Sequence, residues 1–107
     1  MKLISLILAA GAAFAAVPGH AADTDEGRRL AYTCTGCHGV VGYKNIYPHY
    51  NVPRIGGQSK DYIAIALKSY RAGDRTHPTM RAQGEGLTDE QIDLIATYLS
   101  GLGGDAQ

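Results

Sequence analysis

The sequence predicts an all-α protein in which three main helices are joined by irregular loops. Three stretches, 25–36, 59–71 and 89–100, place apolar residues three and four positions apart, as the buried face of a helix does. The intervening segments 39–57 and 73–87 are rich in Gly and Pro, which interrupt helices, so we expect them to be irregular. No segment alternates polar and apolar residues with a period of two, and we therefore expect no sheet.

The first predicted helix follows Thr24, whose side chain suits an N-cap. Gly27 lies inside this helix, although Gly disfavours a helix by about 1 kcal/mol relative to Ala. We therefore expect another helix to pass close to Gly27. One face of the predicted helix carries Gly27, Leu30, Ala31 and Cys34.

The other two helices have start and stop signals of their own. Ser59 is a good N-cap for the stretch 59–71, and Gly73 can end that helix in the left-handed conformation. Residues 88–91 read Thr-Asp-Glu-Gln, which is a capping box for the stretch 89–100. Both helices should therefore form with well-defined beginnings.

Residues 34–38 read Cys-Thr-Gly-Cys-His, which is the C-x-x-C-H signature that attaches a c-type haem. On a helix the two Cys share a face, so both sulfurs reach one edge of a flat porphyrin. His38 follows directly and can turn its imidazole toward the iron. The alternative is a disulfide or a dithiol redox pair, but that motif is expected near a βαβ pattern, and the sequence has none.

The beginning of the chain resembles a secretory signal peptide. A short positive start precedes an apolar run over residues 3–17, which is too short for a comfortable membrane span. We expect residues 1–21 to be a cleaved signal and 22–107 to be the mature haem-binding domain, with cleavage after Ala22 or an uncleaved anchor as alternatives. Export of this kind places the protein in the periplasm of a Gram-negative-type bacterium.

Composition excludes several other functions. Ten Lys and Arg residues balance ten Asp and Glu residues, and no basic run could follow a nucleic acid or bind a membrane surface. The chain has neither a phosphate-binding G-x-x-x-x-G-K-[ST] loop nor a G-x-S-x-G motif. We therefore expect neither a nucleotide-binding protein nor an esterase.

A second axial ligand for the iron can be argued by elimination. Met80 is the one Met that remains once Met1 leaves with the signal, and it lies in a loop that could cover the far face of the ring. A thioether raises the reduction potential relative to a His ligand, and it occupies the position that oxygen or peroxide would need. His77 is the main rival of Met80, and His49 is a weaker one.

Together these runs carry a resemblance to a known family. The runs are Gly27 to Leu30, Cys34 to Gly39, Pro53 to Gln58, Tyr62-Ile63 with Leu67 and Tyr70 to Gly73, Met80, and Leu87 to Leu99. In order and spacing the chain resembles a class I cytochrome c of the small bacterial periplasmic monohaem type, and it is similar to one half of diheme cytochrome c4. The resemblance implies the small cytochrome c fold, with three main helices and loops wrapped around one covalent haem.

The resemblance also implies a role for particular residues. Cys34 and Cys37 would form the thioether links, His38 would be the proximal iron ligand and Met80 the distal one. A backbone carbonyl of the Pro-containing loop, for which we choose Pro53, would accept the other ring N–H of His38. The first and last helices would cross near Gly27, packing Leu30 against the stripe from Ile95 to Leu99. We expect further haem contacts from Pro53, Ile55, Tyr62, Leu67 and Tyr70, with Tyr43, Tyr47 and Tyr50 as haem cover or loop packing.

These features predict an electron carrier rather than an enzyme. One covalent haem c with its iron would cycle between Fe(II) and Fe(III), exchanging single electrons with transient redox partners such as a respiratory donor and a terminal oxidase or reductase. One alternative is the haem-bearing electron-transfer subunit of a periplasmic oxidoreductase complex. Another is a haem protein that binds a gas or reduces peroxide at an open iron position.

Overall fold

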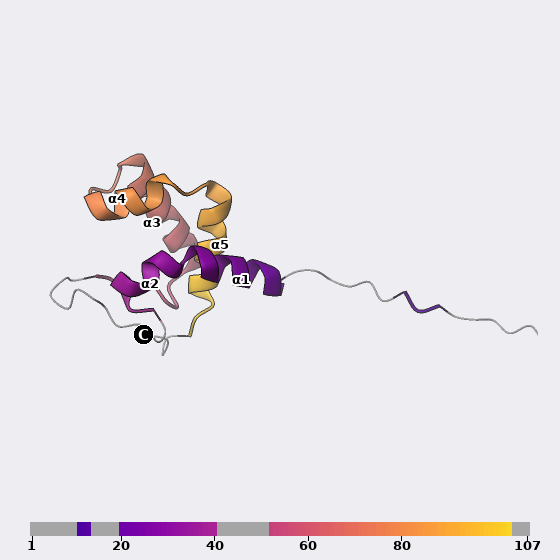
Figure 1. Ribbon diagram of the computed structural model, residues 1–107. Helices are drawn as coiled ribbons and strands as arrows, with labels where there is room; N and C mark the ends of the chain where they lie inside the picture. Colours follow the sequence, from indigo (N-terminus) through magenta and orange to yellow (C-terminus); the bar gives the residue numbers. More distant parts are fainter. Residues whose placement is uncertain (1–10, 14–19, 41–51, 104–107) are drawn as a thin grey trace, which may run out of the picture.

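The protein is all-α over the residues that the structure describes. This computed structural model describes residues 11–13, 20–40 and 52–103, and Figure 1 shows the course of the chain. The expected all-α class is confirmed, because these ranges contain helices and no strand. The helices are α1 (His20–Leu30), α2 (Tyr32–His38), α3 (Lys60–Ala72), α4 (Pro78–Glu85) and α5 (Asp89–Ser100).

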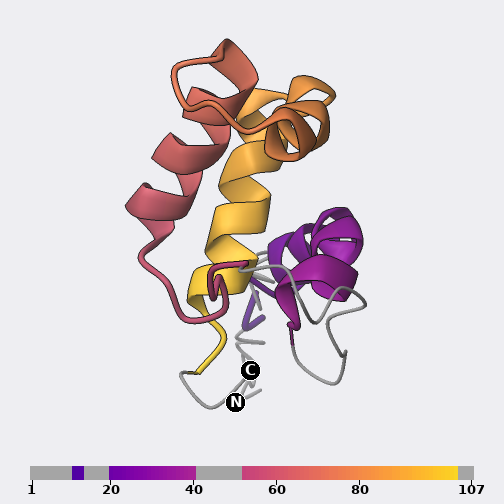
Figure 2. The same ribbon diagram turned by 90° about the vertical axis from the view of Figure 1, so that its left-hand side faces the viewer.

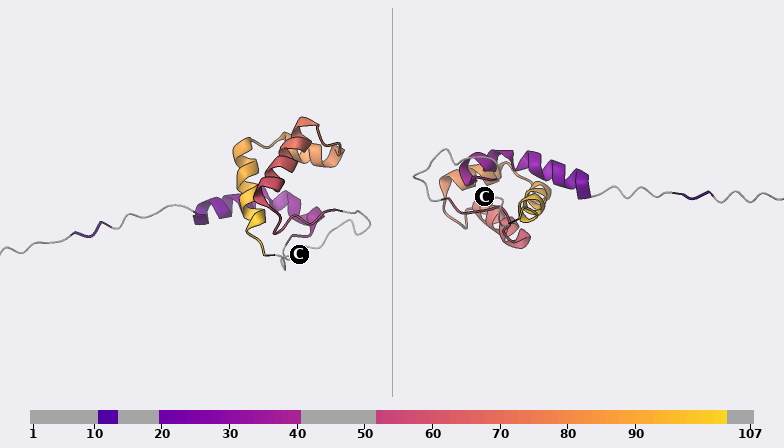
Figure 3. Two further views of the ribbon diagram at one scale, coloured as in Figure 1. Left: turned by 180° about the vertical axis from the view of Figure 1, so that it is seen from behind. Right: turned by 90° about the horizontal axis from the view of Figure 1, so that it is seen from below.

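The core lies where α1 and α3 pack on α5. Helices α3 and α5 run side by side, α1 crosses α5, and α4 packs on α3 (Figures 2 and 3). The apolar face of α5 is completely covered: Ile92 and Ile95 are at most 1% exposed. The other buried apolar residues are Ala31, Val40, Ile63, Leu67, Ala96 and Leu99. Burial of these side chains supplies the main stabilisation of the fold.

The predicted beginnings of α3 and α5 are confirmed. Ser59 caps α3, since its hydroxyl accepts a hydrogen bond from the backbone N–H of Tyr62. Gly73 ends the helix in the left-handed region with φ +88°. At α5 both hydrogen bonds of the capping box between Thr88 and Gln91 are present. These signals act within a few residues, and the helices therefore begin within one position of the predicted limits.

The first predicted helix, 25–36, is wrong in its limits and its continuity. Helix α1 begins at His20, so Thr24 lies inside it and is not its N-cap. Residues 21 and 22 are Ala, which extends helices readily, and this favours the earlier start. The helix breaks at Ala31, where the N–H of Cys34 bonds the Ala31 carbonyl three residues back. Ala31 is completely buried, so this break lies inside the core.

The segment 73–87 is not irregular throughout, because it contains α4. The three main helices expected are therefore joined by two short ones, α2 and α4. Pro78 begins α4, a position where its missing N–H costs nothing. Gly84 was expected to interrupt a helix, but it is buried inside α4. A Cβ there would lie 3.2 Å from the Leu67 carbonyl oxygen, so the glycine lets α4 approach α3 closely.

Gly27 marks the crossing of the first and last helices, as expected. A Cβ added to Gly27 would meet the Leu94 backbone carbonyl and would lie 2.8 Å from the Tyr98 Cβ. Leu30, one turn further along α1, packs against the buried cluster that α5 contributes to. The helical glycine therefore has a packing role at the α1–α5 contact.

In the ranges described, no helix combines the length and the apolar character needed to cross a membrane.

Candidate functional site

An open cavity lies between α2 and α4. In Figure 1 helix α2 is at the lower left of the fold and helix α4 is at the upper left. The empty volume between the protein atoms there, including the open mouth of the cavity, is ≈ 560 Å³. The lining residues are Leu30, Thr33, Cys34, Cys37, His38, Leu67, Thr79, Met80, Gln83, Leu87 and Ile95.

Helix α2 supplies the sulfur and imidazole groups of the cavity. Cys34 and Cys37 are one helical turn apart, so both thiols share a face, and both are free and half-buried. His38 is the last residue of α2, because Gly39 follows in the left-handed region with φ +61°. The helix therefore ends where the imidazole leaves it for the cavity.

The His38 ring is fixed by a backbone carbonyl on the opposite loop. Its Nδ1 lies 2.8 Å from the Pro53 carbonyl oxygen, so Nδ1–H donates and the proton is assigned to Nδ1. The loop is held in turn by Gly57, whose N–H donates to the Leu99 carbonyl at 2.8 Å. The hydrogen bond between His38 and the Pro53 carbonyl is the one that the resemblance implied. It leaves Nε2 without a proton and able to bind a metal.

The surroundings of Cys34 raise the pKa of its thiol. Burial raises the pKa of the Cys34 thiol, a hydrogen bond with Thr33 opposes this rise, and the nearby Cys37 adds to it. At neutral pH the Cys34 sulfur therefore keeps its hydrogen.

Helix α4 brings Met80 to the cavity together with two neighbours. Met80 is partly buried against the core cluster, and Thr79 and Gln83 line the cavity beside it. The rival His77 is not among the lining residues, because its ring bonds the start of α4. His49 and the tyrosines at positions 43, 47 and 50 lie outside the described residues, as does most of the expected signal peptide.

Only some of the predicted haem contacts lie at the cavity. Leu67 lines the cavity, and Pro53 contributes through its carbonyl to His38. Ile55 packs against the core, and Tyr62 is 52% exposed. Tyr70 lies edge-on to the His77 ring. None of these last three is among the cavity-lining residues described.

Sequence reasoning missed most of the cavity wall. Leu30, Leu87 and Ile95 come from three distant parts of the chain, and no local pattern joins them. Gln83 could have been found, because it is three residues after Met80. Had the segment been recognised as a helix, that spacing would have placed both on one face.

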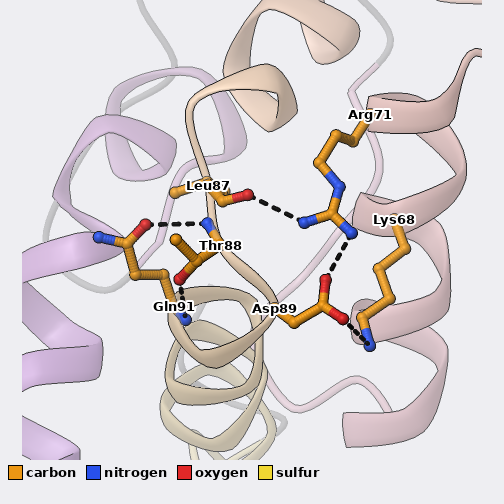
Figure 4. Close-up of polar contacts among 6 residues, drawn as sticks. All are labelled: Lys68, Arg71, Leu87, Thr88, Asp89 and Gln91. Carbon is orange, nitrogen blue, oxygen red and sulfur yellow. Dashed lines mark hydrogen bonds and ion pairs between the residues drawn. The ribbon is translucent and has the colours of Figure 1, made fainter.

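A polar network ties the cavity wall to α3 (Figure 4). The Arg71 guanidinium donates to the Leu87 carbonyl at 2.9 Å and to Asp89 Oδ1 at 2.5 Å. Lys68 Nζ lies 3.6 Å from the other Asp89 oxygen. These contacts with Arg71 and then Lys68 lower the pKa of Asp89. Arg71 thereby connects α3 to the link between α4 and α5, in which Leu87 lines the cavity.

Asp89→Asn is expected to destabilise the protein at pH 7 but not in acid. Because the pKa of Asp89 is lower in the folded than in the unfolded chain, its contribution is complete above the unfolded value of about 4. The contribution disappears as the pH falls through the folded pKa. Urea midpoints should therefore draw together for the variant and the parent as the pH falls from 7 towards 2, since urea does not screen the ion pair as a guanidinium salt does. Glu90→Gln, in the same helical turn, is the control, and a difference of constant size across this range would contradict the prediction.

Comparison with known proteins identifies the family. Residues 24–103 match the Cytochrome c family. The chain belongs to the cytochrome c family. Its cofactor is accordingly a covalent haem c with its iron, and its role is electron transfer rather than enzymatic catalysis.

Two relatives and one solved structure show how far this cytochrome c matches known proteins. It is 37% identical to the cytochrome subunit of sulfide dehydrogenase of Chlorobaculum tepidum, over 91% of this chain and 90% of the relative. It is also 37% identical to cytochrome c-554(548) of Halomonas halodenitrificans, over 75% of this chain and 96% of the relative. The structure of reduced recombinant cytochrome c4 from Pseudomonas stutzeri matches with a TM-score of 0.63 and 27% identity. That match covers 78% of this cytochrome c and 50% of the longer chain.

The residues around the cavity fit the cofactor of the family. Two thiols, one imidazole and one thioether line a single space whose remaining wall is largely aliphatic. Thioether and imidazole are the axial ligands found in electron-transferring cytochromes c. The cavity of this cytochrome c therefore suits haem both in its donor groups and in its apolar lining.

Proposed function

We propose that this cytochrome c is a periplasmic electron carrier whose one haem is attached through Cys34 and Cys37 and ligated by His38 and Met80. The observation that carries the proposal is that all four side chains line one cavity. Bound there, haem c supplies reversible one-electron chemistry between Fe(II) and Fe(III). The chain's own groups attach the ring, orient it and exclude other ligands.

The attachment residues are arranged for addition to two vinyl groups. Each thiol would add its sulfur and its hydrogen across one vinyl double bond, so neither an oxidant nor a reductant is consumed. Cys34 and Cys37 lie on one face of α2, which suits two bonds to one edge of a ring. The reaction leaves no free thiol in the chain, since the sequence has two Cys.

The ligand residues are held by backbone contacts on both sides. His38 Nδ1 bonds the Pro53 carbonyl, which orients the ring and increases the basicity of Nε2. On the other side, α4 packs on α3 and carries Met80 into the cavity. A thioether ligand favours the ferrous state relative to a second His. It would also keep oxygen and peroxide from the iron, as an electron carrier requires.

The signal peptide and the periplasmic location belong to this proposal. Attachment of haem to C-x-x-C-H fits an exported chain, and the apolar run over residues 3–17 fits a secretory signal. Cleavage after Ala21 would keep all but the first two residues of α1. Transient redox partners are the expected donors and acceptors.

A second candidate function is the haem subunit of an oxidoreductase. The observation that favours it is the similarity to the cytochrome subunit of sulfide dehydrogenase, which this chain matches over 90% of that relative's length. In that case a catalytic subunit would remain bound to the protein during purification.

One preparation from the periplasm tests these points. We expect the denatured protein to have the mass of residues 22–107 plus one haem, and its colour to stay with the polypeptide in acidified organic solvent. Haem that passes into the solvent would overturn the covalent site. Size-exclusion chromatography of the same native sample separates the two functions, because a carrier elutes alone and a subunit elutes with a second, cofactor-bearing chain.

A further inference from the structure

The His77 side chain caps the helix that carries Met80. His77 has an extended backbone, with φ −159° and ψ 103°, directly before the first residue of α4. Its Nδ1 lies 3.2 Å from the Met80 backbone nitrogen and accepts that N–H. Its carbonyl accepts from the N–H of Arg81 at 2.8 Å. His77 thus satisfies one N–H group that the start of a helix leaves unpaired, that of Met80, and its carbonyl accepts the first hydrogen bond within α4.

The capped N–H belongs to the residue whose side chain lines the cavity. Met80 is the third residue of α4, and an N-cap side chain commonly bonds the N–H at this position. Without the cap the first turn can fray, and fraying displaces the Met80 backbone and sulfur together. The contact therefore couples the His77 ring to the position of the thioether.

The ring of His77 is itself held in place by α3. The Tyr70 ring meets it edge-on, with centroids 6.2 Å apart and planes at 75°. Arg75 follows the end of α3, and its guanidinium lies 4.5 Å from the centroid of the Tyr70 ring. At the other end of α4, Gly84 packs against the Leu67 and Arg71 backbone. The start of α4 is thus positioned through His77 and its end through Gly84.

We propose that His77 is a positioning residue for the iron ligand Met80, and that it acts through the Met80 backbone N–H. The proposal rests on the proposed function, in which Met80 is the distal ligand. It removes His77 from the candidates for iron ligation, because Nδ1 is used by the helix and the ring lies outside the cavity lining. An added ligand must displace Met80, so loss of the cap should make that displacement easier.

Two substitutions of His77 separate the cap from the ring. In Asn the side-chain oxygen stands where Nδ1 stands in His, two bonds from Cβ, and Asn is a preferred N-cap. His77→Ala should raise the affinity of the ferric haem protein for imidazole about fivefold, the ratio that corresponds to one lost cap. His77→Asn should remain within about twofold of the parent. If His77→Ala does not fold, His77→Gln replaces it, since its acceptor is one bond too far to cap.

A cap on another helix provides the matched control. Thr88→Ala removes the N-cap of α5, whose hydroxyl accepts from Gln91 at 3.1 Å. It should lower the unfolding temperature without changing imidazole affinity. Equal imidazole affinity for His77→Ala and the parent, or an equal rise in Thr88→Ala, overturns the proposal. If the parent lacks the thioether–iron charge-transfer band, or Met80→Ala leaves the spectrum unchanged, the ligand assignment in the proposed function fails instead. If both His77 variants change the spectrum while Met80→Ala does not, His77 is the ligand, and both proposals fail.

Discussion

Met80→Ala is expected to abolish the charge-transfer band between thioether sulfur and ferric iron and to let added imidazole bind. Met80 lines the cavity from α4, and the only other Met is Met1. If Met80 occupies the position more than about nine-tenths of the time, its removal raises the imidazole affinity roughly tenfold or more. The reduction potential should fall as well, because the thioether favours the ferrous iron. Absorption spectra of the ferric protein measure the band, and an imidazole titration measures the affinity. A potentiometric titration measures the reduction potential.

Gln83→Ala is the matched control for this substitution. Gln83 lines the same cavity from the same helix and is three residues after Met80, but it offers no thioether. We expect the band to persist in this variant, which shows that a change in the cavity wall is not enough to remove it. A spectrum that is the same in Met80→Ala and the parent would instead indicate ligation by His77 or His49. Rapid carbon monoxide binding by the unmodified ferrous protein would favour a gas-binding role.

Gly27→Ala should lower the free energy of unfolding by about 3 kcal/mol, the upper part of the range for added volume in a packed core. The new methyl group would meet the Leu94 backbone carbonyl and the Tyr98 Cβ, neither of which can rotate away. Ala would otherwise favour the helix by about 1 kcal/mol, so propensity alone predicts the opposite sign. Guanidinium unfolding of the haem-loaded protein, followed by circular dichroism, measures the difference.

Gly86→Ala supplies the comparison. Gly86 has φ −83°, which any residue can adopt, and a Cβ there meets nothing within 4 Å. We expect its free energy of unfolding to change by less than about 1 kcal/mol, with a small gain if the unfolded chain loses entropy. Equal unfolding midpoints for the two variants would show that the α1–α5 crossing tolerates a side chain at position 27.

The sequence predicted α3 and α5 well because their capping signals are local. The Ser59 hydroxyl and the capping box at 88–91 act within one turn, and tertiary contacts then reinforce the same limits. Helix α4 was missed because its N-cap is a His and its interior contains Gly84. Only the close approach to α3 explains that glycine, and such an approach cannot be seen along the sequence. The break at Ala31 lies inside the core, and the spacing of apolar residues along the sequence did not indicate it.

The residues of the site likewise fall into those that the local sequence predicted and those that it did not. Cys34, Cys37 and His38 are adjacent along the chain, and their spacing alone predicted the chemistry. Met80 followed from the scarcity of Met. The resemblance implied that Leu30 packs against the stripe that begins at Ile95, but not that these residues form a cavity wall with Leu87. That wall forms only after α1 has crossed α5. The expected contact of Tyr62 with the haem stays a prediction, since half of its surface is exposed and it is not among the cavity-lining residues described.

The crossing at Gly27 also has a consequence for incomplete chains. The two helices that cross there are the first and the last described, and the residues that line the cavity run from Leu30 in α1 to Ile95 in α5. A chain that stops before residue 89 has no surface on which α1 can pack, and it lacks Ile95 from the cavity wall. Closing a loop of this length costs entropy that only the completed contact repays. A prematurely terminated product can therefore contain the whole attachment motif and still lack the packing that holds the motif in place.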